Sequence, residues 1–289
     1  MAFDVWKTLY TDQFDSDRFL YHYSSFDKAI KILQSGSLRF SPINKTNDTV
    51  ESKVRISFVQ PSGACPKDYT LKTQTIYNYL TAHHPEVRLL CFSTDHSLDN
   101  GDIHNNEQHT LAKYKYYDVS GRGFALPRMW SQYADNNQGV CFVFDKEKLL
   151  DQAKKSIVLY REGMVSYKKC TDYFYIDENT VETLYAQIST TANGSLAFVP
   201  MMQNTDFIQY NFFQKLEDWK NEREYRIIAL TGNDTPLYIQ NLPTFLEGIV
   251  IGENIDPAYE EVIKLLVSQH HTRCAVKKIS FSGQICKLK

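Results

Sequence analysis

Many short apolar runs of strand length alternate in this sequence with segments of helical periodicity, and no regular strand–helix repeat orders them. Gly139–Asp145 (GVCFVFD) is the clearest strand, and Phe19–Ser25 has an aromatic side chain at every second position, as a strand does. Irregular alternation of this kind is typical of α+β proteins, whereas a doubly wound parallel sheet needs regular βαβ units. We therefore predict a single elaborated α+β domain over residues 1–289, with a helical extension at 1–17.

The same periodicities, read together with turn and capping residues, place the other elements. Helices are predicted over 26–34, 47–58, 67–84, 128–134, 146–154, 179–190, 206–218 and 257–269. Strands are predicted over 37–41, 87–93, 156–160, 164–168, 224–230, 237–239, 248–251 and 275–281. Gly36 follows the first helix at the position where a left-handed residue ends a helix. The polar segment 95–127 is predicted to be a long loop.

Composition narrows the class of protein. Hydrophobic residues make up 43% of the chain, enough to build a core, and a net charge of −2 gives no overall electrostatic reason to bind a polyanion. The N-terminus does not resemble a signal peptide, and no apolar run approaches the roughly 18 residues of a membrane span. The six cysteines form no Cys-x-x-Cys pair, which fits a reducing compartment. We expect a cytoplasmic protein that does not bind a membrane.

Common catalytic signatures are missing from the sequence. It contains no dinucleotide-binding Gly-x-Gly-x-x-Gly, no Walker sequence, no His-Glu-x-x-His and no Gly-x-Ser-x-Gly. His96, His104 and His109 lie in the long loop without a carboxylate or thiolate at matching spacing. No metal site is therefore expected.

Two segments place polar and aromatic side chains where strands meet helices. In Tyr21–Ser25 (YHYSS), strand alternation points His22 away from its two tyrosine neighbours. Such a histidine either lies in a polar site on that face of the sheet or is buried in the core and hydrogen-bonded to the backbone. In Met129–Ala134 (MWSQYA), Trp130 and Tyr133 share one helical face, an arrangement that is usually a packing stripe.

A third segment, Trp219–Arg226 (WKNEREYR), leads into an apolar strand. Glu222, Glu224 and Arg226 follow one another at period two and therefore point to one side. This pattern describes either a solvated strand edge with paired charges or a carboxylate held in a site by an arginine. The spacing alone leaves both interpretations open.

Taken together, these segments resemble DUF2971, a bacterial family of unknown function. The matching segments are, in chain order, Tyr21–Ser25, Leu38–Pro42, Asn47-Asp48 with Glu51, Cys91–Ser93, Met129–Ala134 with Gly139, and Trp219–Arg226. Two positions depart from the family pattern: Gln132 stands where the family has a histidine, and Thr49 stands where it has a proline. The first departure argues against proton transfer at that position.

DUF2971 in turn looks like a distant relative of the ADP-ribosyltransferases of the His-Tyr-Glu class. The resemblance implies a split β-sandwich core of mixed strands, His22 as a ligand of the NAD ribose, and Glu224 or Glu222 as the catalytic acid. It implies an NAD site formed by further side chains, namely Tyr23, Arg39, Ser41, Ser93, Trp130, Tyr133 and Arg226. Arg39 or Arg226 would neutralise the pyrophosphate.

The implied function is NAD-dependent ADP-ribosylation of a macromolecule, either protein or nucleic acid, by a bacterial toxin or anti-phage effector with an antitoxin protein as a further partner. Cleavage of the bond to nicotinamide passes through an oxocarbenium-like ribose, which a carboxylate stabilises. Two alternatives stay open: an NAD glycohydrolase, and a non-catalytic nucleotide-binding or sensing module. A nuclease is disfavoured, because the sequence shows neither an acidic metal cluster nor a basic bias.

Overall fold

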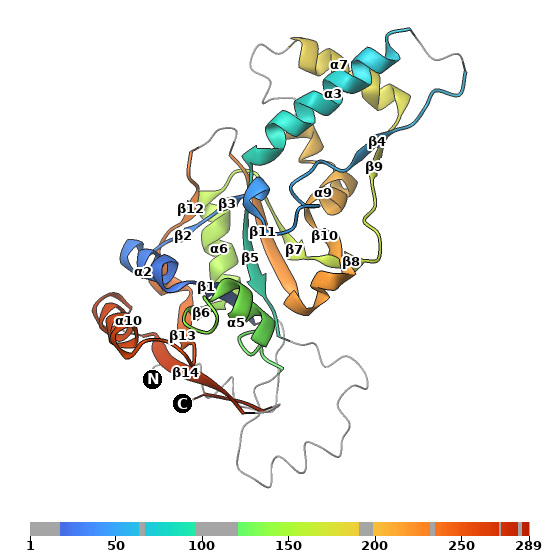
Figure 1. Ribbon diagram of the computed structural model, residues 1–289. Coiled ribbons are helices and arrows are strands. Elements are labelled where there is room, and N and C mark those ends of the chain that lie inside the picture. The colour runs from blue at the N-terminus through green and yellow to red at the C-terminus, as the bar shows by residue number, and fades with distance from the viewer. Residues whose placement is uncertain are drawn as a thin grey trace.

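The computed structural model describes residues 18–63, 67–95, 121–190, 199–231, 235–271, 273–282 and 285–288. The molecule is elongated: a sheet with its covering helices forms one end, and the helices α3 (Tyr69–His83), α7 (Glu178–Thr190) and α9 (Thr205–Phe212) form the other (Figure 1). No helix of the described residues is long and apolar enough to cross a membrane. The predicted extension at 1–17 and residues 96–120 of the predicted loop lie outside the described residues.

One nine-stranded sheet organises the fold. Its order is β15-β14-β13-β6-β1-β5-β11-β7, with β3 pairing β5 off this path. The strands are β1 (Phe19–Ser24), β3 (Ser41–Pro42), β5 (Val87–Ser93), β6 (Val140–Asp145), β7 (Tyr160–Met164), β11 (Glu224–Leu230), β13 (Leu246–Ile251), β14 (Ala275–Ser282) and β15 (Ile285–Leu288). The pair β13–β14 is parallel, while the other pairs are antiparallel. A mixed sheet with separate helices confirms the predicted α+β class.

The sheet is weakly joined between β1 and β5. Strand β1 pairs with β6 along its whole length, whereas a single register pair, Tyr21 opposite Ser93, joins it to β5. Further along β5, β3 takes the place of β1, with Ser41 opposite Leu89. The sheet therefore consists of two well-paired halves that meet at one point.

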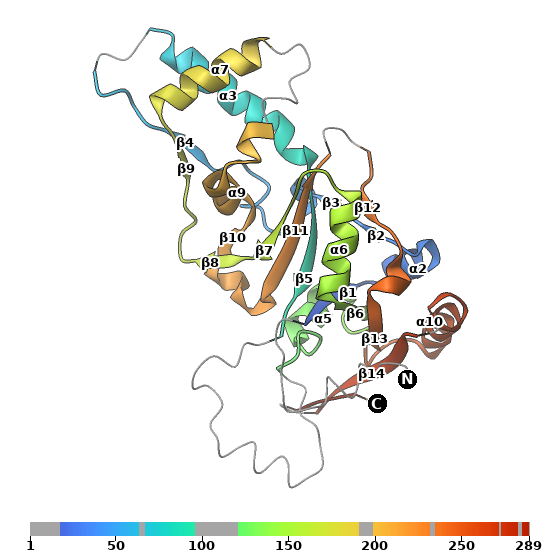
Figure 2. The same ribbon diagram turned by 180° about the vertical axis from the view of Figure 1, so that it is seen from behind.

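Side-chain alternation gives the sheet two apolar faces. One face packs against α2 (Phe26–Ser35), α6 (Lys146–Ser156) and α10 (Pro257–His270) and forms the first core, which includes Phe142, Phe144, Ile227 and Ile249. Helix α6 lies across this face in Figure 2. The opposite face carries two further cores. The second includes Leu89, Phe212 and Ile228 beside the helical end, and the third includes Tyr21, Trp130 and Val143 beside α5 (Pro127–Tyr133).

The segment between α5 and β6 is a tight left-handed turn. Asp135, Asn136 and Asn137 have φ of 47°, 53° and 67°, in the region that favours glycine. The turn is held by the backbone, because the carbonyl of Asn137 accepts the N–H of Asn254 at 3.0 Å. A Cβ on Gly252 would lie 2.0 Å from that carbonyl oxygen, so only glycine fits there. This contact fixes α5, and with it Tyr133, relative to the sheet.

Elements with strong periodicity or clear breakers are confirmed within a few residues, among them β1, α2, β5, β6, β11 and α10. Gly36 ends α2 as predicted, with φ of 62° and its N–H donated to Ile32. The helix predicted over 47–58 is wrong. The Asp48 carboxylate accepts the N–H of Val50 at 2.8 Å, which closes a turn, and β4 (Ile56–Phe58) follows.

The helix predicted over 206–218 is too long. Helix α9 ends at Phe212, and β10 (Gln214–Leu216) pairs in parallel with β8 (Ser166–Lys168). The parallel pair of β4 with β9 (Phe174–Ile176) escaped prediction. Strands β2 (Leu38–Arg39) and β12 (Tyr238–Ile239), which pair with each other, lie within the strands predicted over 37–41 and 237–239. Strands of two or three residues carry no periodicity, and partners distant in sequence define them.

Candidate functional site

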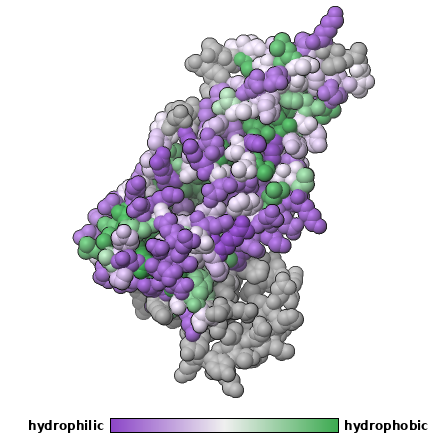
Figure 3. All heavy atoms as spheres, in the orientation of Figure 1, coloured by the Kyte–Doolittle hydropathy of each residue, from purple (hydrophilic) through white to green (hydrophobic). Residues whose placement is uncertain are grey.

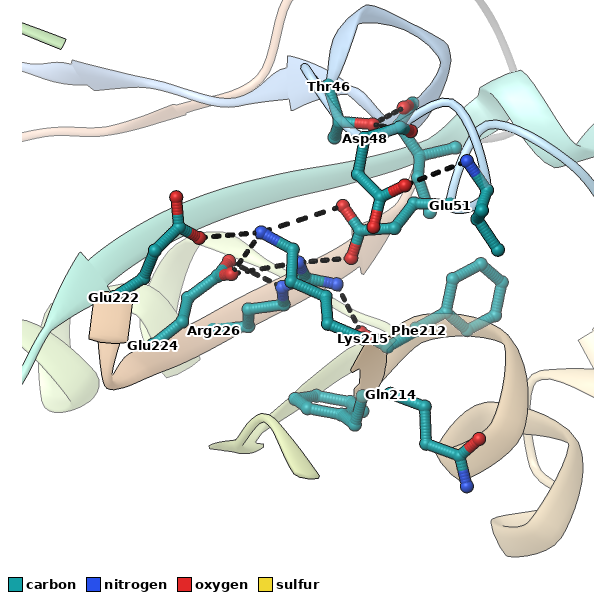
Figure 4. Close-up of polar contacts among 12 residues, drawn as sticks. Thr46, Asp48, Glu51, Phe212, Gln214, Lys215, Glu222, Glu224 and Arg226 are labelled. Atoms are coloured by element: carbon teal, nitrogen blue, oxygen red, sulfur yellow. Dashed lines mark hydrogen bonds and ion pairs between the residues drawn. The ribbon is translucent and has the colours of Figure 1, made fainter. Parts of the chain in front are cut away.

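Charged side chains are buried where β11 begins. Glu222 ends the 3-10 helix η3 (Glu217–Glu222), and Glu224 and Arg226 follow on β11; all three are at most 3% exposed. Tyr225 belongs to the first core, so its neighbours Glu224 and Arg226 point to the opposite face of the sheet. Together with Glu51 and Lys215, which are also buried, they form what we call the ionic cluster (Figure 4).

Arg226 lies at the centre of the ionic cluster. Its Nε is 2.5 Å from one carboxylate oxygen of Glu224 and its Nη2 is 3.0 Å from the other, which is the bidentate geometry of a strong pair. Its Nη2 also forms an ion pair with Glu51. Its Nη1 donates to the carbonyl of Phe212 at 2.7 Å, at the end of α9, where the helix dipole favours a cation. Arg226 therefore joins the sheet to the helical end of the molecule.

Lys215, from β10, binds the carboxylates from the other side. Its Nζ is 2.8 Å from Glu222, 2.7 Å from Glu224 and 3.9 Å from Glu51. The ammonium also lies over the ring of Trp219, 5.0 Å from its centroid. All three carboxylates of the cluster thus share a single lysine.

Tyr133 links the ionic cluster to helix α5. Its hydroxyl donates to the second carboxylate oxygen of Glu222 at 2.8 Å, and its side chain is half-buried. Burial and the charge of Glu222 raise the pKa of Tyr133, so the phenol stays protonated and remains a donor at neutral pH. Glu222 is therefore held from two directions at the edge of the cluster.

The carboxylates of the cluster differ in their affinity for protons. Burial raises the pKa of Glu224, but Arg226 and Lys215 outweigh burial and bring it to about 2. Burial dominates at Glu51, and the pKa of Glu51 is raised in spite of the same two cations. Glu224 is consequently a fixed anion locked to its partners, while Glu51 is the carboxyl of this pair that takes up a proton more readily.

The structure does not bring His22 together with the carboxylates. The imidazole Nδ1 is 2.9 Å from the carbonyl oxygen of Cys91. The ring packs beside Phe92 of the first core, with ring centroids 5.8 Å apart. Glu224 projects from the other face, since it pairs in register with Ser93, which itself pairs with Tyr21. His22 and Glu224 therefore lie on opposite faces of the sheet.

Other residues expected at the NAD site have packing roles or lie apart. Tyr23 donates its hydroxyl to the Gly123 carbonyl at 2.8 Å, and Trp130 is fully buried in the third core. Their rings meet edge to face, with centroids 5.2 Å apart. Arg39 and Ser41 are exposed on β2 and β3.

Ser93, Glu222, Glu224, Arg226 and Tyr133 are the predicted residues that do meet. Ser93 is 1% exposed and lies opposite Glu224, and its hydroxyl has no hydrogen-bond partner among the residues described. Trp130 belongs to the same helix as Tyr133 but points into the third core. Glu224 and Arg226 share one face of β11, as their period-two spacing predicts, whereas Glu222 precedes the strand and reaches the cluster from η3.

Sequence reasoning missed three contributors to the cluster. Lys215 fell inside a predicted helix, where no pattern distinguished it. Tyr167 accepts the backbone N–H of Glu224 at 2.9 Å and carried no signal either. Glu51 did carry a signal, its place in the Asn-Asp-x-x-Glu match, but it lies in the segment that was predicted as a helix over 47–58.

Beyond Glu51 the polar interior continues to Arg55 and His84. The Arg55 guanidinium donates to the carbonyl of Gln214 at 3.3 and 3.4 Å. His84 is 2% exposed and stacks on Phe212, with centroids 5.5 Å apart. Burial, helped by Arg55, lowers the pKa of His84 to about 4.

We expect His84 to make the fold sensitive to mild acid. Its pKa is lower in the folded state than its ordinary value of 6.5, so the unfolded chain takes up the proton first. Neutral His84 therefore contributes fully to the free energy of unfolding above pH 6.5, and this contribution is lost as the pH falls toward 4. Between pH 7 and pH 5 the free energy of unfolding should fall by about 2 kcal/mol for this reason. Urea unfolding at pH 7 and pH 5 measures this loss, and the free energy of unfolding should change less between the two pH values in His84→Gln than in the wild type. The exposed His270→Gln serves as control, and an undiminished difference in His84→Gln contradicts the prediction.

The fold and the site define an α+β protein with a two-halved mixed sheet and a buried ionic cluster on one face. A family model described as "Protein of unknown function (DUF2971)" matches residues 129–227. This range contains Tyr133, Lys215 and the Glu222–Arg226 segment, so the match supports the DUF2971 resemblance. No curated protein and no solved structure matches the chain significantly.

Proposed function

We propose that the chain is an NAD-dependent ADP-ribosyltransferase that modifies a macromolecule, with Glu222 as the catalytic carboxylate. The observation that carries the proposal is the arrangement of Tyr133, Glu222 and Lys215 at the edge of the ionic cluster. The single-point contact between β1 and β5 supports it, because a split sheet is the core that the resemblance implies. The family resemblance also suggests a bacterial toxin or anti-phage effector, restrained by an antitoxin.

Glu222 is better suited to this role than Glu224. Both oxygens of Glu224 are bound by Arg226, and Lys215 adds a second cation to one of them. Glu222 receives one bond on each oxygen, and each carboxylate oxygen has two lone pairs, so acceptor capacity remains for a ribose hydroxyl. Glu222 also lies among side chains that reach the surface, because its neighbours Tyr133 and Trp219 are both half-buried.

Transfer of ADP-ribose from NAD requires one anion that is held in a fixed position beside the ribose. The bond between C1′ of the ribose and the nicotinamide nitrogen breaks, and its electron pair leaves with nicotinamide. The acceptor then adds to C1′ and loses a proton, after an oxocarbenium-like transition state. A carboxylate that binds the 2′-hydroxyl stabilises that positive charge, and Lys215 and Tyr133 would hold Glu222 in place for it.

Label transfer from adenylate-labelled NAD tests the proposal. The purified chain is incubated with labelled NAD, cell lysate and nucleic acid. Glu222→Gln is expected to lose about a hundredfold in label transfer, because the anion at the transition state is removed. Glu217→Gln is the matched control, since Glu217 lies on the same 3-10 helix with a side chain that is 45% exposed, and it should retain full transfer. Full activity in Glu222→Gln overturns the assignment.

A second candidate is a non-catalytic module in which the ionic cluster holds β11 against the helical end. Its supporting observation is that each charged group of the cluster has an oppositely charged partner inside it. It predicts neither NAD turnover nor a thermal shift with NAD. Free ADP-ribose without labelled macromolecule would instead indicate a glycohydrolase.

A further inference from the structure

Arg223 lies between the two glutamates of the ionic cluster and has a backbone conformation that residues other than glycine rarely adopt. Its φ is 47° and its ψ is 53°, in the left-handed region. The backbone is held on both sides: the Arg223 N–H donates to the carbonyl of Lys220 at 3.2 Å, and the Arg223 carbonyl accepts the N–H of Thr94 at 3.0 Å. Glycine would adopt this conformation without strain, so an arginine here has a conformational cost that a function of its side chain would offset.

The guanidinium of Arg223 is half-buried and has few partners in the described part of the chain. Its Nη1 donates to the carbonyl of Gly121 at 3.3 Å, and it forms no ion pair with a described residue. The carboxylate that attracts it most strongly, that of Asp95, is bound by Arg122 at 2.6 Å and by the N–H of Gly123 at 2.8 Å. Burial lowers the pKa of Arg223, as expected for a cation removed from water without a bound counterion. Most of its N–H donors therefore remain available to a ligand.

Arg223 lies beside the proposed catalytic carboxylate. Glu222 precedes it in the chain, so their Cα atoms are about 3.8 Å apart. Gly121, which accepts the bond from Arg223, lies shortly before α5, and Tyr133 at the end of that helix binds Glu222. Figure 3 shows hydrophilic side chains over the middle of the molecule, where α5 lies in Figure 1. Arg223 and Glu222 are thus both bound to the segment 121–133, on a polar side of the molecule.

The two arginines expected at the pyrophosphate are not placed to bind it. The guanidinium of Arg226 is bound by Glu224, by Glu51 and by the carbonyl of Phe212. Arg39 lies on β2, which belongs to a separate two-stranded sheet. A nucleotide held at Glu222 therefore needs another cation for its phosphates, and Arg223, the chain neighbour of Glu222, binds no described carboxylate.

We propose that Arg223 binds the diphosphate group of the nucleotide whose ribose lies at Glu222. This inference rests on the proposed function and adds the residue that recognises the anionic part of the substrate. A guanidinium forms paired, charge-assisted hydrogen bonds with phosphate oxygens, and partial burial strengthens them. The diphosphate supplies the counterion that Arg223 otherwise lacks. The ligand class is therefore a nucleoside diphosphate ester such as NAD or ADP-ribose, and a nucleoside without phosphates does not satisfy the site.

Isothermal titration calorimetry of the full chain with ADP-ribose tests the proposal, because ADP-ribose carries the diphosphate and has no nicotinamide to lose. Arg223→Gly removes the guanidinium and relieves the left-handed strain. It should weaken ADP-ribose binding by about tenfold or more, while the thermal unfolding midpoint stays the same or rises. Arg161→Ala is the matched control, because Arg161 also donates to one carbonyl but is exposed on β7, and it should bind ADP-ribose as the wild type does. Adenosine should not distinguish Arg223→Gly from the wild type.

Binding and label transfer, measured on the same samples, separate this inference from the proposed function. A wild type that does not bind ADP-ribose at millimolar concentration, or an Arg223→Gly variant that binds it equally well, overturns the role of Arg223. Binding that depends on Arg223 in a chain without label transfer overturns the transferase and leaves the diphosphate site in place. If Arg223→Gly does not fold, Arg223→Lys keeps the charge without the paired geometry and should still weaken binding several-fold. Unchanged binding in Arg223→Lys would then contradict the proposal.

Discussion

Arg226→Ala is expected to lower the free energy of unfolding by about 5 kcal/mol, because it removes the arginine from a buried pair and leaves carboxylates behind. Glu224 loses its bidentate partner, Glu51 loses one of its two cations, and Lys215 alone would face three carboxylates. The carbonyl of Phe212, the last residue of α9, also loses the hydrogen bond that Arg226 donates to it. Urea unfolding monitored by circular dichroism measures the loss.

Arg161→Ala is the matched control for this experiment. Arg161 is exposed on β7, the neighbour of β11, and its substitution should change stability by less than about 0.5 kcal/mol. Arg226→Lys keeps the charge without the bidentate geometry and should lose an intermediate amount, which remains measurable if the alanine variant does not fold. A loss below about 1 kcal/mol in Arg226→Ala would show that the ionic cluster does not hold the fold.

This structural role decides how catalysis must be tested. Glu224→Gln weakens the pair with Arg226, so lost activity in that variant would not distinguish chemistry from unfolding. Glu222 is bound by Lys215 and Tyr133 but not by Arg226, and its replacement leaves the central pair intact. Stability and label transfer measured on the same Glu222→Gln sample therefore separate the two interpretations.

Sequence patterns identified part of the ionic cluster because part of it is local. The period-two spacing of Glu224 and Arg226 on β11 was visible in the sequence and is confirmed. The contacts of Glu51 and Lys215 join segments from distant parts of the chain, and no local periodicity encodes them. Both lie in segments that were predicted as helix and are turn or short strand in the structure.

His22 likewise shows that a local pattern does not determine the contacts between distant strands. Strand alternation predicts that His22 points away from Tyr21 and Tyr23, and it does. Whether it shares a face with Glu224 depends on the register of β1 with β5 and of β5 with β11. A shift of one residue in either pairing would reverse the answer. Register is set by packing across the whole sheet, so the sequence pattern could not decide which carboxylates His22 faces.

Asp95→Ala is expected to be the second severe change, with a loss of about 4 kcal/mol in the free energy of unfolding. The Asp95 carboxylate follows β5 and lies 2.6 Å from the guanidinium of Arg122, and both side chains are at most 1% exposed. Its other oxygen accepts the N–H of Gly123 at 2.8 Å. The substitution would leave the buried Arg122 without this carboxylate and the Gly123 amide without its acceptor.

A double-mutant cycle shows whether this loss comes from an uncompensated charge. Arg122→Met alone should be nearly as costly as Asp95→Ala, because Asp95 is then the buried charge without its counterion. The double variant should be more stable than the sum of the two losses predicts, by about 2 kcal/mol, since it buries neither charge. Asp68→Ala, at a pair with Lys72 in which the Asp68 side chain is 56% exposed, should change the free energy of unfolding by less than about 1 kcal/mol. Additive losses in the cycle would mean that the two side chains act separately, and that the junction of β5 with α5 is held by packing rather than by this pair.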